Sequence, residues 1–294
     1  MKRQQQELNR FLHEPGVVER KESESFIALP KITIVTPSYN QGNFLERTIK
    51  SVLNQNYPGL EYIIFDGASK DGSVEIIKKY QSHLAFWQSA PDRGQSHAII
   101  KGFERSSGEV LGWLNSDDVL LPNALSLVGA FFKRHPEIDV VYGDSYTIDE
   151  NDRILRETRS VKFNKFAFLT SAFSLHQASI FWRRAIYFKS RGVNKDDHLT
   201  LDRDLWLAFF QSGARFKHLP KPLACFRYYP ATKTAQNAEK IADLMHENVK
   251  RRFGINLRSG YWQQIRKIMR ARTFFYHLIY GNLFYLLRNA GKTC

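Results

Sequence analysis

Cysteine is almost absent from this 294-residue chain. The two cysteines, Cys225 and Cys294, lie far apart, and the second is the last residue. Two isolated thiols argue against a disulfide framework and against a zinc site. This cysteine usage fits a protein of the reducing cytoplasm.

Long apolar runs are also missing. No stretch reaches the roughly 18 consecutive apolar residues that a membrane-spanning helix requires. Residues 1–20 are charged and polar, without the apolar centre of a secretory signal peptide. We therefore expect a cytoplasmic protein without a clean membrane span.

Acidic residues are outnumbered, since 43 Lys and Arg face 29 Asp and Glu and give a net charge of +14. Such a surplus attracts polyanions, which include nucleic acid, anionic lipid headgroups and phosphorylated substrates. The chain is rich in Lys and Arg and poor in acids from Lys250 onward, whereas the acidic motifs lie in the N-terminal half. The basic excess is thus separated in sequence from the acidic motifs.

Strands alternate with helices from Pro30 onward. The β-branched, apolar segment 31–36 predicts a buried strand, and apolar residues at helical spacing predict a helix over 43–54. The same cycle recurs with strands at 61–65, 84–88 and 110–114 and with helices at 72–80, 96–105 and 123–134. An alternation at intervals of roughly 25–30 residues indicates right-handed βαβ units and a mostly parallel, Rossmann-like α/β sheet flanked by helices.

Each of these four strands ends in a polar cluster. The clusters are Thr36-Pro-Ser-Tyr-Asn40, Asp66-Gly-Ala-Ser-Lys-Asp71, Pro91-Asp-Arg-Gly-Gln95 and Asn115-Ser-Asp-Asp118. Ligands of open parallel sheets bind outside the carboxyl ends of the strands, so we expect the four clusters to meet on one rim. A nucleic-acid-binding face should be basic and aromatic without such an acidic rim, so we expect no nucleic-acid partner.

Two of the clusters carry carboxylates suited to ligand chemistry. Asp117 and Asp118 follow an apolar strand, and adjacent carboxylates there suit Mg²⁺ or Mn²⁺ held together with phosphate oxygens. The alternative is that one of them caps the next helix. Asp66 stands directly at a strand end, where it could accept hydrogen bonds from a nucleobase or a ribose, while Asp71 and Gly72 suit a turn.

In this order and spacing, the four clusters resemble family 2 glycosyltransferases with the GT-A fold, over roughly 31–229. The resemblance implies an inverting glycosyltransferase that needs a divalent metal, Mg²⁺ or Mn²⁺. The implied donor is a nucleotide-diphosphate sugar, by default a UDP-sugar. The implied acceptor is a saccharide or a lipid-linked saccharide in cell-surface polysaccharide synthesis.

The resemblance also implies a donor site made by Thr36, Pro37, Tyr39, Asp66, Asp92, Gln95 and Ser116. Thr36, Pro37 and Tyr39 would line the base pocket, and Asp66 would read the base. Asp92 and Gln95 would lie near the ribose or the sugar. Asp117 would be the main metal ligand, with Asp118 beside it.

Asn115 departs from the family pattern, which usually has Asp at the start of the metal motif. The site therefore has one charge fewer, and metal binding should be weaker or depend more on the diphosphate. This departure keeps open a catalytically degenerate relative that binds sugars or partners. A nucleotidyltransferase is a further alternative, but such enzymes usually bring a Gly-rich basic loop after the first strand, where this chain has Thr-Pro-Ser-Tyr-Asn-Gln-Gly.

The second half supplies the remaining chemistry. Leu201-Asp-Arg-Asp-Leu-Trp206 resembles the family's later acidic motif, whose leading Asp is the general base, so Asp202 is expected to deprotonate the acceptor. Asp204 is expected at the acceptor or phosphate, or in an orienting role. The alternative for both acids is a favourable place at a helix N-terminus. The resemblance puts His176 and Gln177 at the acceptor side, in contact with acceptor or phosphate.

Three regions are expected: a lead-in over 1–29, the GT-A domain over 30–235 and a basic amphipathic helical region over 236–294. In the last region, Trp262, Ile265 and Met269 lie at helical spacing among basic residues, before the aromatic run 274–287. A basic helix with an aromatic, apolar face is typical of a membrane interface. We therefore expect peripheral contact with the inner face of the membrane; the alternatives are packing on the core and a dimer contact.

Overall fold

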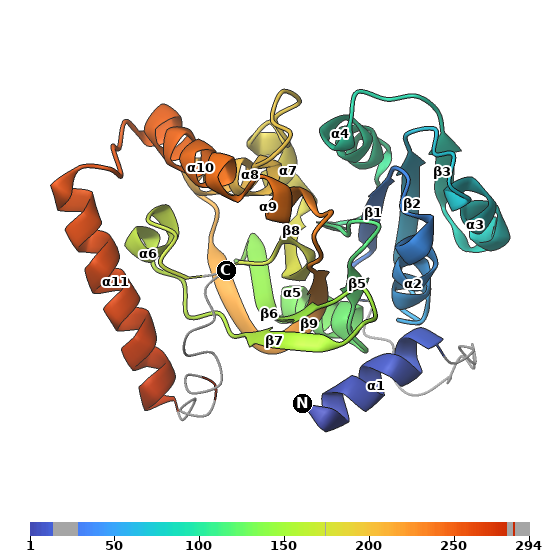
Figure 1. Cartoon of the computed structure of the whole chain (residues 1–294), viewed down its shortest axis with the longest axis horizontal. Coiled ribbons are helices and arrows are strands. Elements are labelled where there is room, and N and C mark those ends of the chain that lie inside the picture. The colour runs from blue at the N-terminus through green and yellow to red at the C-terminus, as the bar shows by residue number, and fades with distance from the viewer. Residues whose placement is uncertain (14–28, 174, 281–284, 286–294) are drawn as a thin grey trace.

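The computed structural model describes residues 1–13, 29–173, 175–280 and 285 (Figure 1). The strands are β1 Ile32–Ser38, β2 Leu60–Asp66, β3 Phe86–Ser89, β4 Val110–Trp113, β5 Val119–Leu120, β6 Val140–Ile148, β7 Ile154–Thr158, β8 Ile180–Arg183 and β9 Phe216–Arg227. The α-helices are α1 Lys2–His13, α2 Gly42–Leu53, α3 Ser73–Tyr80, α4 Gln95–Arg105, α5 Ala124–Arg134, α6 Lys165–Leu169, α7 Arg184–Lys189, α8 Leu201–Gln211, α9 Lys233–Gln236, α10 Ala238–Phe253 and α11 Gly260–Ile279. Short 3-10 helices cover Gln81–His83 and Gln177–Ser179.

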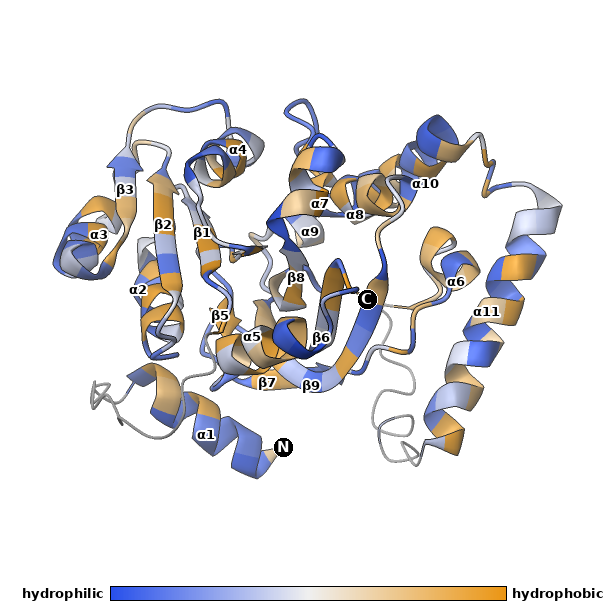
Figure 2. Ribbon diagram, turned by 180° about the vertical axis from the view of Figure 1, so that it is seen from behind, coloured by the Kyte–Doolittle hydropathy of each residue, from blue (hydrophilic) through white to orange (hydrophobic). Residues whose placement is uncertain are grey.

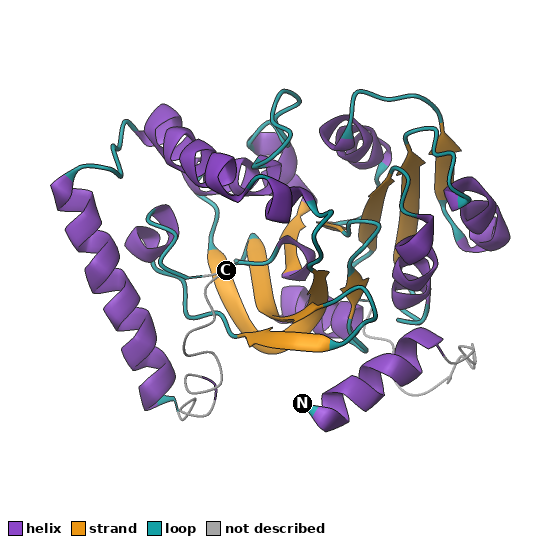
Figure 3. Cartoon of the chain, in the orientation of Figure 1, coloured by secondary structure: helices purple, strands orange, loops and turns teal. Residues whose placement is uncertain are grey.

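One curved, nine-stranded sheet organises the chain, in the order β3-β2-β1-β4-β8-β6-β9-β5, with β7 paired to β6 (Figure 3). Strands β1, β2, β3 and β4 are parallel neighbours, and β6 and β9 run in the same direction as they do. The three remaining strands, β5, β7 and β8, run the opposite way. The expected mostly parallel α/β sheet flanked by helices is confirmed.

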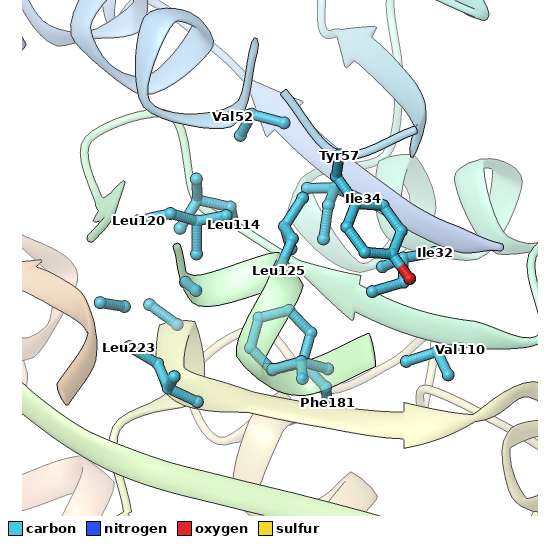
Figure 4. Packing of buried hydrophobic residues seen from close by; sticks show 14 of the residues in the cluster. Ile32, Ile34, Val52, Tyr57, Val110, Leu114, Leu120, Leu125, Phe181 and Leu223 are labelled. Atoms are coloured by element: carbon cyan, nitrogen blue, oxygen red, sulfur yellow. The ribbon is translucent and has the colours of Figure 1, made fainter. Parts of the chain in front are cut away.

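The two faces of the sheet bury two apolar clusters, because side chains alternate along each strand. Ile32 and Ile34 of β1 join the cluster that packs against α2 and α5, whereas Val35 joins the cluster against α4 and α8. Figure 4 shows part of the first cluster, with Tyr57 and Leu125 beside β1. The amphipathic patterns of the first four strands and helices, which predicted the elements, therefore also account for their packing.

The C-terminal helices differ in how they attach. Helix α10 packs on α8, where the buried carboxylate of Asp204 accepts hydrogen bonds from Arg251 and Arg252. Helix α11 lies at the outer edge of the molecule beside α6 (Figure 1), and hydrophobic residues alternate with hydrophilic ones along it (Figure 2). In the described ranges, no helix combines the length and apolar content that crossing a bilayer requires. Much of the aromatic run 274–287 and of the lead-in 1–29 lies outside the described residues.

A buried arginine joins three segments beneath the strand ends. Arg227, at the end of β9, is fully buried, and its guanidinium donates hydrogen bonds to the carbonyl oxygens of Asp117 (2.7 Å) and Asp149 (2.6 Å) and to Oδ1 of Asp152 (2.5 Å). Its backbone N–H donates to Oδ1 of Asp118 at 2.8 Å. This arginine therefore fixes the position of the loop that follows β4.

Arg227→Met should lower the free energy of unfolding by about 3 kcal/mol, because removing one partner of a buried ion pair leaves its groups unsatisfied. Urea unfolding measures the loss. Arg215→Met is the matched control, since the Arg215–Asp139 pair lies at the surface and should contribute less than about 1 kcal/mol. Equal losses in the two variants would contradict the role given to Arg227.

Candidate active site

The carboxylate of Asp66, at the end of β2, is held by hydrogen bonds from two serines. Its oxygens accept hydrogen bonds from Ser69 Oγ (2.5 Å), Ser69 N (2.9 Å) and Ser89 Oγ (2.7 Å). Asp66 is 2% exposed. A carboxylate offers about four acceptor positions, so these three bonds leave about one position for a ligand and fix the direction of the carboxylate.

An exposed aromatic ring lies beside this strand end. Tyr39, in the loop after β1, is 64% exposed. A Cβ added at Gly67 would lie 3.1 Å from Cδ2 of Tyr39 and 3.3 Å from Oδ1 of Asp92, so the absence of a side chain at Gly67 lets these two residues approach from both sides. Clusters that follow β1, β2 and β3 therefore meet as expected, and an accessible ring among them suits stacking on a planar base.

Thr36 and Pro37 are buried within β1 and are not exposed at the rim. Thr36 is fully buried, and its hydroxyl shares a hydrogen bond with Tyr62. The next residue, Ser38, is 4% exposed, and its Oγ is a buried polar atom without a hydrogen-bond partner among the described residues. A buried hydroxyl without a partner calls for an explanation, and a ligand at the end of β1 would supply one.

Asn115 is the centre of a hydrogen-bond chain. Its Oδ1 accepts from Nε2 of Gln95 (2.8 Å) and from Nε1 of Trp113 (3.1 Å), while its Nδ2 donates to Oδ2 of Asp118 (3.2 Å). An amide can accept and donate at once, whereas an ionised carboxylate can only accept. The departure from the family's Asp therefore has a structural reason, because an aspartate could not donate to Asp118.

The two aspartates of this cluster face different surroundings. Asp118 is 1% exposed, and both of its oxygens are used internally, by Arg227 N and by Asn115. Burial, with the charge of Asp117, raises its pKa well above the usual value. Asp117 is partly exposed, and its Oδ2 accepts a hydrogen bond from Tyr229 OH at 3.3 Å. Ser116, between them, is 5% exposed, and its carbonyl accepts from Thr48 Oγ1.

A divalent metal at this rim would have few ligands from the protein. Within the described residues, no group of three or more His, Cys, Asp and Glu is placed to hold a metal ion. Asp117 is the accessible carboxylate of the motif, since Asp118 is buried. Mg²⁺ is commonly bound through one or two carboxylates together with substrate phosphates, so the donor set fits a metal that arrives with a diphosphate.

Asp202 is half-buried in the first turn of α8, where its Oδ1 accepts a hydrogen bond from the backbone N–H of Arg203. Burial raises the pKa of its carboxyl group. Trp206, one turn further, stacks on Trp113 with ring centroids 6.2 Å apart. The loop before α8 also contacts the first turn of α4, directly after the third cluster, since Ser96 Oγ donates to the carbonyl of Lys195. The start of α8 is thus packed beside the strand ends.

The residues expected at the acceptor side have varied surroundings. His176 shares a 2.7 Å hydrogen bond between its Nδ1 and Ser145 Oγ. Nε2 of Gln177 donates to the Trp113 carbonyl at 2.7 Å, and its Oε1 is buried without a partner in the described part of the chain. Asp204 is fully buried in its pairing with Arg251 and Arg252. Its expected contact with acceptor or phosphate is wrong for this geometry, because the carboxylate points into the α8–α10 contact.

Residues after β9 complete the rim, and the sequence interpretation missed them. Tyr229 OH contacts both Asp117 and Gln41, and Nζ of Lys233 donates to Oε1 of Gln95 at 3.0 Å. The sequence does contain a sign of these residues, because they belong to a fifth polar segment that follows a strand. Pro220 and Pro222 within β9 hid that strand, since proline is normally excluded from strand interiors.

A model of the family "Glycosyl transferase family 2" matches residues 33–206. Chondroitin synthase of Escherichia coli is 28% identical over 205 residues, which are 69% of this chain and 30% of that protein. Putative glycosyltransferase EpsE of Bacillus subtilis is 26% identical over 201 residues, which are 66% of this chain and 72% of that protein. The chain thus spans under a third of the length of the chondroitin synthase.

Two solved structures share the fold at low sequence identity. TarS 1–349 of S. aureus, solved in complex with UDP-GlcNAc, has a TM-score of 0.61 at 16% identity and covers 84% of this chain and 72% of its own. The mannosyltransferase PcManGT of Pyrobaculum calidifontis, solved with GDP-Man and Mn²⁺, has a TM-score of 0.57 at 17% identity and covers 97% and 79%. The expected GT-A fold is confirmed.

The stability of the protein should fall in acid through His176. Burial lowers the pKa of His176 from 6.5 to about 4, so the folded state binds this proton less readily than the unfolded state. The stabilisation is therefore complete above pH 6.5 and is lost as the pH falls towards 4. His176→Gln, which can keep the bond to Ser145, should show a shallower decline in urea unfolding between pH 7 and pH 4. Equal declines would contradict this burial effect.

Proposed function

The chain belongs to glycosyltransferase family 2, and on this premise we propose that it transfers a sugar with inversion from a nucleotide-diphosphate donor, a UDP-sugar, to a saccharide or lipid-linked saccharide acceptor. The reaction would serve cell-surface polysaccharide synthesis. The similarity to a protein named chondroitin synthase supports the polysaccharide acceptor. One observation carries the proposal: the ends of β1 to β4 bring an exposed ring, carboxylates and a fixed amide chain to one rim.

The donor nucleotide would lie across the ends of β1, β2 and β3. Tyr39 offers its exposed ring to the base. The fixed carboxylate of Asp66 and the unpartnered hydroxyl of Ser38 lie at the ends of neighbouring strands in register, where a base or ribose could bond them. Asp92 and Gln95 extend the site towards the sugar, whereas Thr36, Pro37 and the buried Asp118 shape it from inside.

Asp117 would hold the divalent metal together with the donor diphosphate. A bound Mg²⁺ or Mn²⁺ neutralises charge that develops on the departing diphosphate. The protein's part is to aim the carboxylate. Tyr229 fixes one oxygen of Asp117 from the β9 side, and Arg227 holds the carbonyl of the same residue from below.

Asp202 would act as the general base. Its raised pKa makes the carboxylate a better proton acceptor than an ordinary aspartate. It takes the proton of the acceptor hydroxyl while the hydroxyl oxygen forms the new bond to the anomeric carbon. The bond from that carbon to the diphosphate oxygen breaks on the opposite face, and the nucleoside diphosphate leaves with the bonding pair. His176 and Gln177 would border the acceptor.

Asp202→Asn should lower the transfer rate by about 10²–10⁴-fold, the usual contribution of a general base, and leave donor binding nearly unchanged. A panel of UDP- and GDP-sugars with saccharide acceptors measures transfer, and calorimetry with UDP or GDP measures binding. Asp196→Asn, on the exposed loop before α8, is the matched control and should keep full activity. Full activity in Asp202→Asn would assign the base to another residue.

Helix α11 supports a peripheral contact with the inner face of the membrane. Its large apolar residues are exposed, among them Tyr261 at 70%, Phe275 at 55% and Ile279 at 77%. Lys267, Arg270 and Arg272 are exposed on the same helix. Apolar side chains that enter the headgroup region beside cationic residues fit an anionic bilayer surface.

The triple variant Ile268→Asp, Phe275→Asp, Ile279→Asp should abolish sedimentation with vesicles that contain anionic phosphatidylglycerol. Binding by the unchanged protein should weaken with added salt, because part of the attraction is electrostatic. Leu155→Asp, at an exposed apolar residue far from α11 in the chain, is the control and should still sediment. If the triple variant sediments like the unchanged protein, α11 does not bind the membrane.

A further inference from the structure

A lysine from the segment after β9 lies at the rim. Lys233 begins α9, and the N-cap of this helix is Thr232, whose Oγ1 accepts a hydrogen bond from Ala235 N. The ammonium group donates to Oε1 of Gln95 at 3.0 Å. Partial burial lowers the pKa of the ammonium group, and the charges of Asp117 and Asp92 oppose this effect. No ion pair within 4.0 Å joins the ammonium to a carboxylate in the described ranges.

The position of this ammonium is set by a chain of bonds that starts in the core. Asp118 holds Asn115 Nδ2, and Asn115 Oδ1 holds Gln95 Nε2. The amide of Gln95 is thereby oriented with its oxygen towards Lys233. Each link has one direction, because the indole N–H of Trp113 can only donate and therefore fixes Oδ1 of Asn115 as the acceptor.

The rim is also short of negative charge for holding a dication. Asn115 is neutral, and Asp118 is buried and bonded on both oxygens, so Asp117 remains as the accessible carboxylate of the motif. A nucleoside diphosphate brings at least two negative charges, which a metal held by a single carboxylate must meet largely alone. A fixed ammonium beside that carboxylate would share this task.

We propose that Lys233 binds the diphosphate of the nucleotide donor directly, whether or not a metal is bound, and stabilises it as the leaving group. This inference rests on the proposed function, which it deepens by assigning a cation from the chain itself. The lysine ammonium is a compact point charge suited to phosphate oxygens. Gln95 keeps the ammonium of Lys233 in place without neutralising its charge.

The consequence is a nucleotide affinity that persists without metal. Calorimetry should show that the unchanged protein binds UDP or GDP in EDTA. Lys233→Met should raise that Kd by 10-fold or more and leave the weaker binding of the corresponding nucleoside unchanged, because the nucleoside has no phosphate. Lys233→Arg should recover part of the affinity. Lys240→Met, at an exposed lysine of α10, is the matched control and should bind as the unchanged protein does.

The binding measurements distinguish a failure of the role of Lys233 from a failure of the proposed glycosyltransferase function. Equal affinity for the diphosphate in Lys233→Met and the unchanged protein overturns the role of Lys233, and so does binding of UDP or GDP that requires Mn²⁺ in the unchanged protein. Either result leaves the glycosyltransferase proposal intact. If the unchanged protein binds neither UDP nor GDP with or without Mn²⁺, the proposed function itself fails. Lys233→Gln, compared by urea unfolding, serves as the second variant if the methionine variant does not fold.

Discussion

One buried guanidinium determines where the rim lies. Arg227 bonds the carbonyl oxygens of Asp117 and Asp149 and the carboxylate of Asp152, so it connects the loop after β4, the β6–β7 hairpin and the end of β9. It also lies over the ring of Phe44, which contacts the ring of Tyr229. A charge buried this deeply persists only when each of its donors is satisfied. The two halves of the sheet are therefore held in one arrangement at the point where ligands would bind.

In this arrangement the two neighbouring aspartates of the rim point in different directions. Asp118 points inward to Arg227 N and Asn115, whereas Asp117 remains partly exposed and meets Tyr229. Hydrogen bonds through Asn115 and Gln95 connect the buried residues to Lys233 at the rim. A rim with one accessible carboxylate of the motif and one fixed ammonium suits a diphosphate that binds together with its metal. The neutral Asn115 contributes by holding the amide of Gln95, which in turn holds the ammonium.

The first half of the fold could be predicted from the sequence because its strands and helices follow one regular pattern with polar clusters at the strand ends. Two of the later strands could not. Strand β5 has two residues, and β9 contains two prolines, so neither shows a strand pattern. Within the site, the position of Asp66 and Asp117 followed from the strand ends. The inward turn of Asp204 depends on arginines 47 and 48 residues away, a contact that no local pattern reveals.

The most direct measurement is a crystal structure of the protein with UDP and Mn²⁺. The arrangement of residues predicts the base on Tyr39, the diphosphate between Asp117 and Lys233, and the open face of the sugar site towards Asp202. A nucleotide bound away from the ends of β1 to β4, or a diphosphate that contacts neither Asp117 nor Lys233, would contradict the single rim on which the proposed chemistry depends.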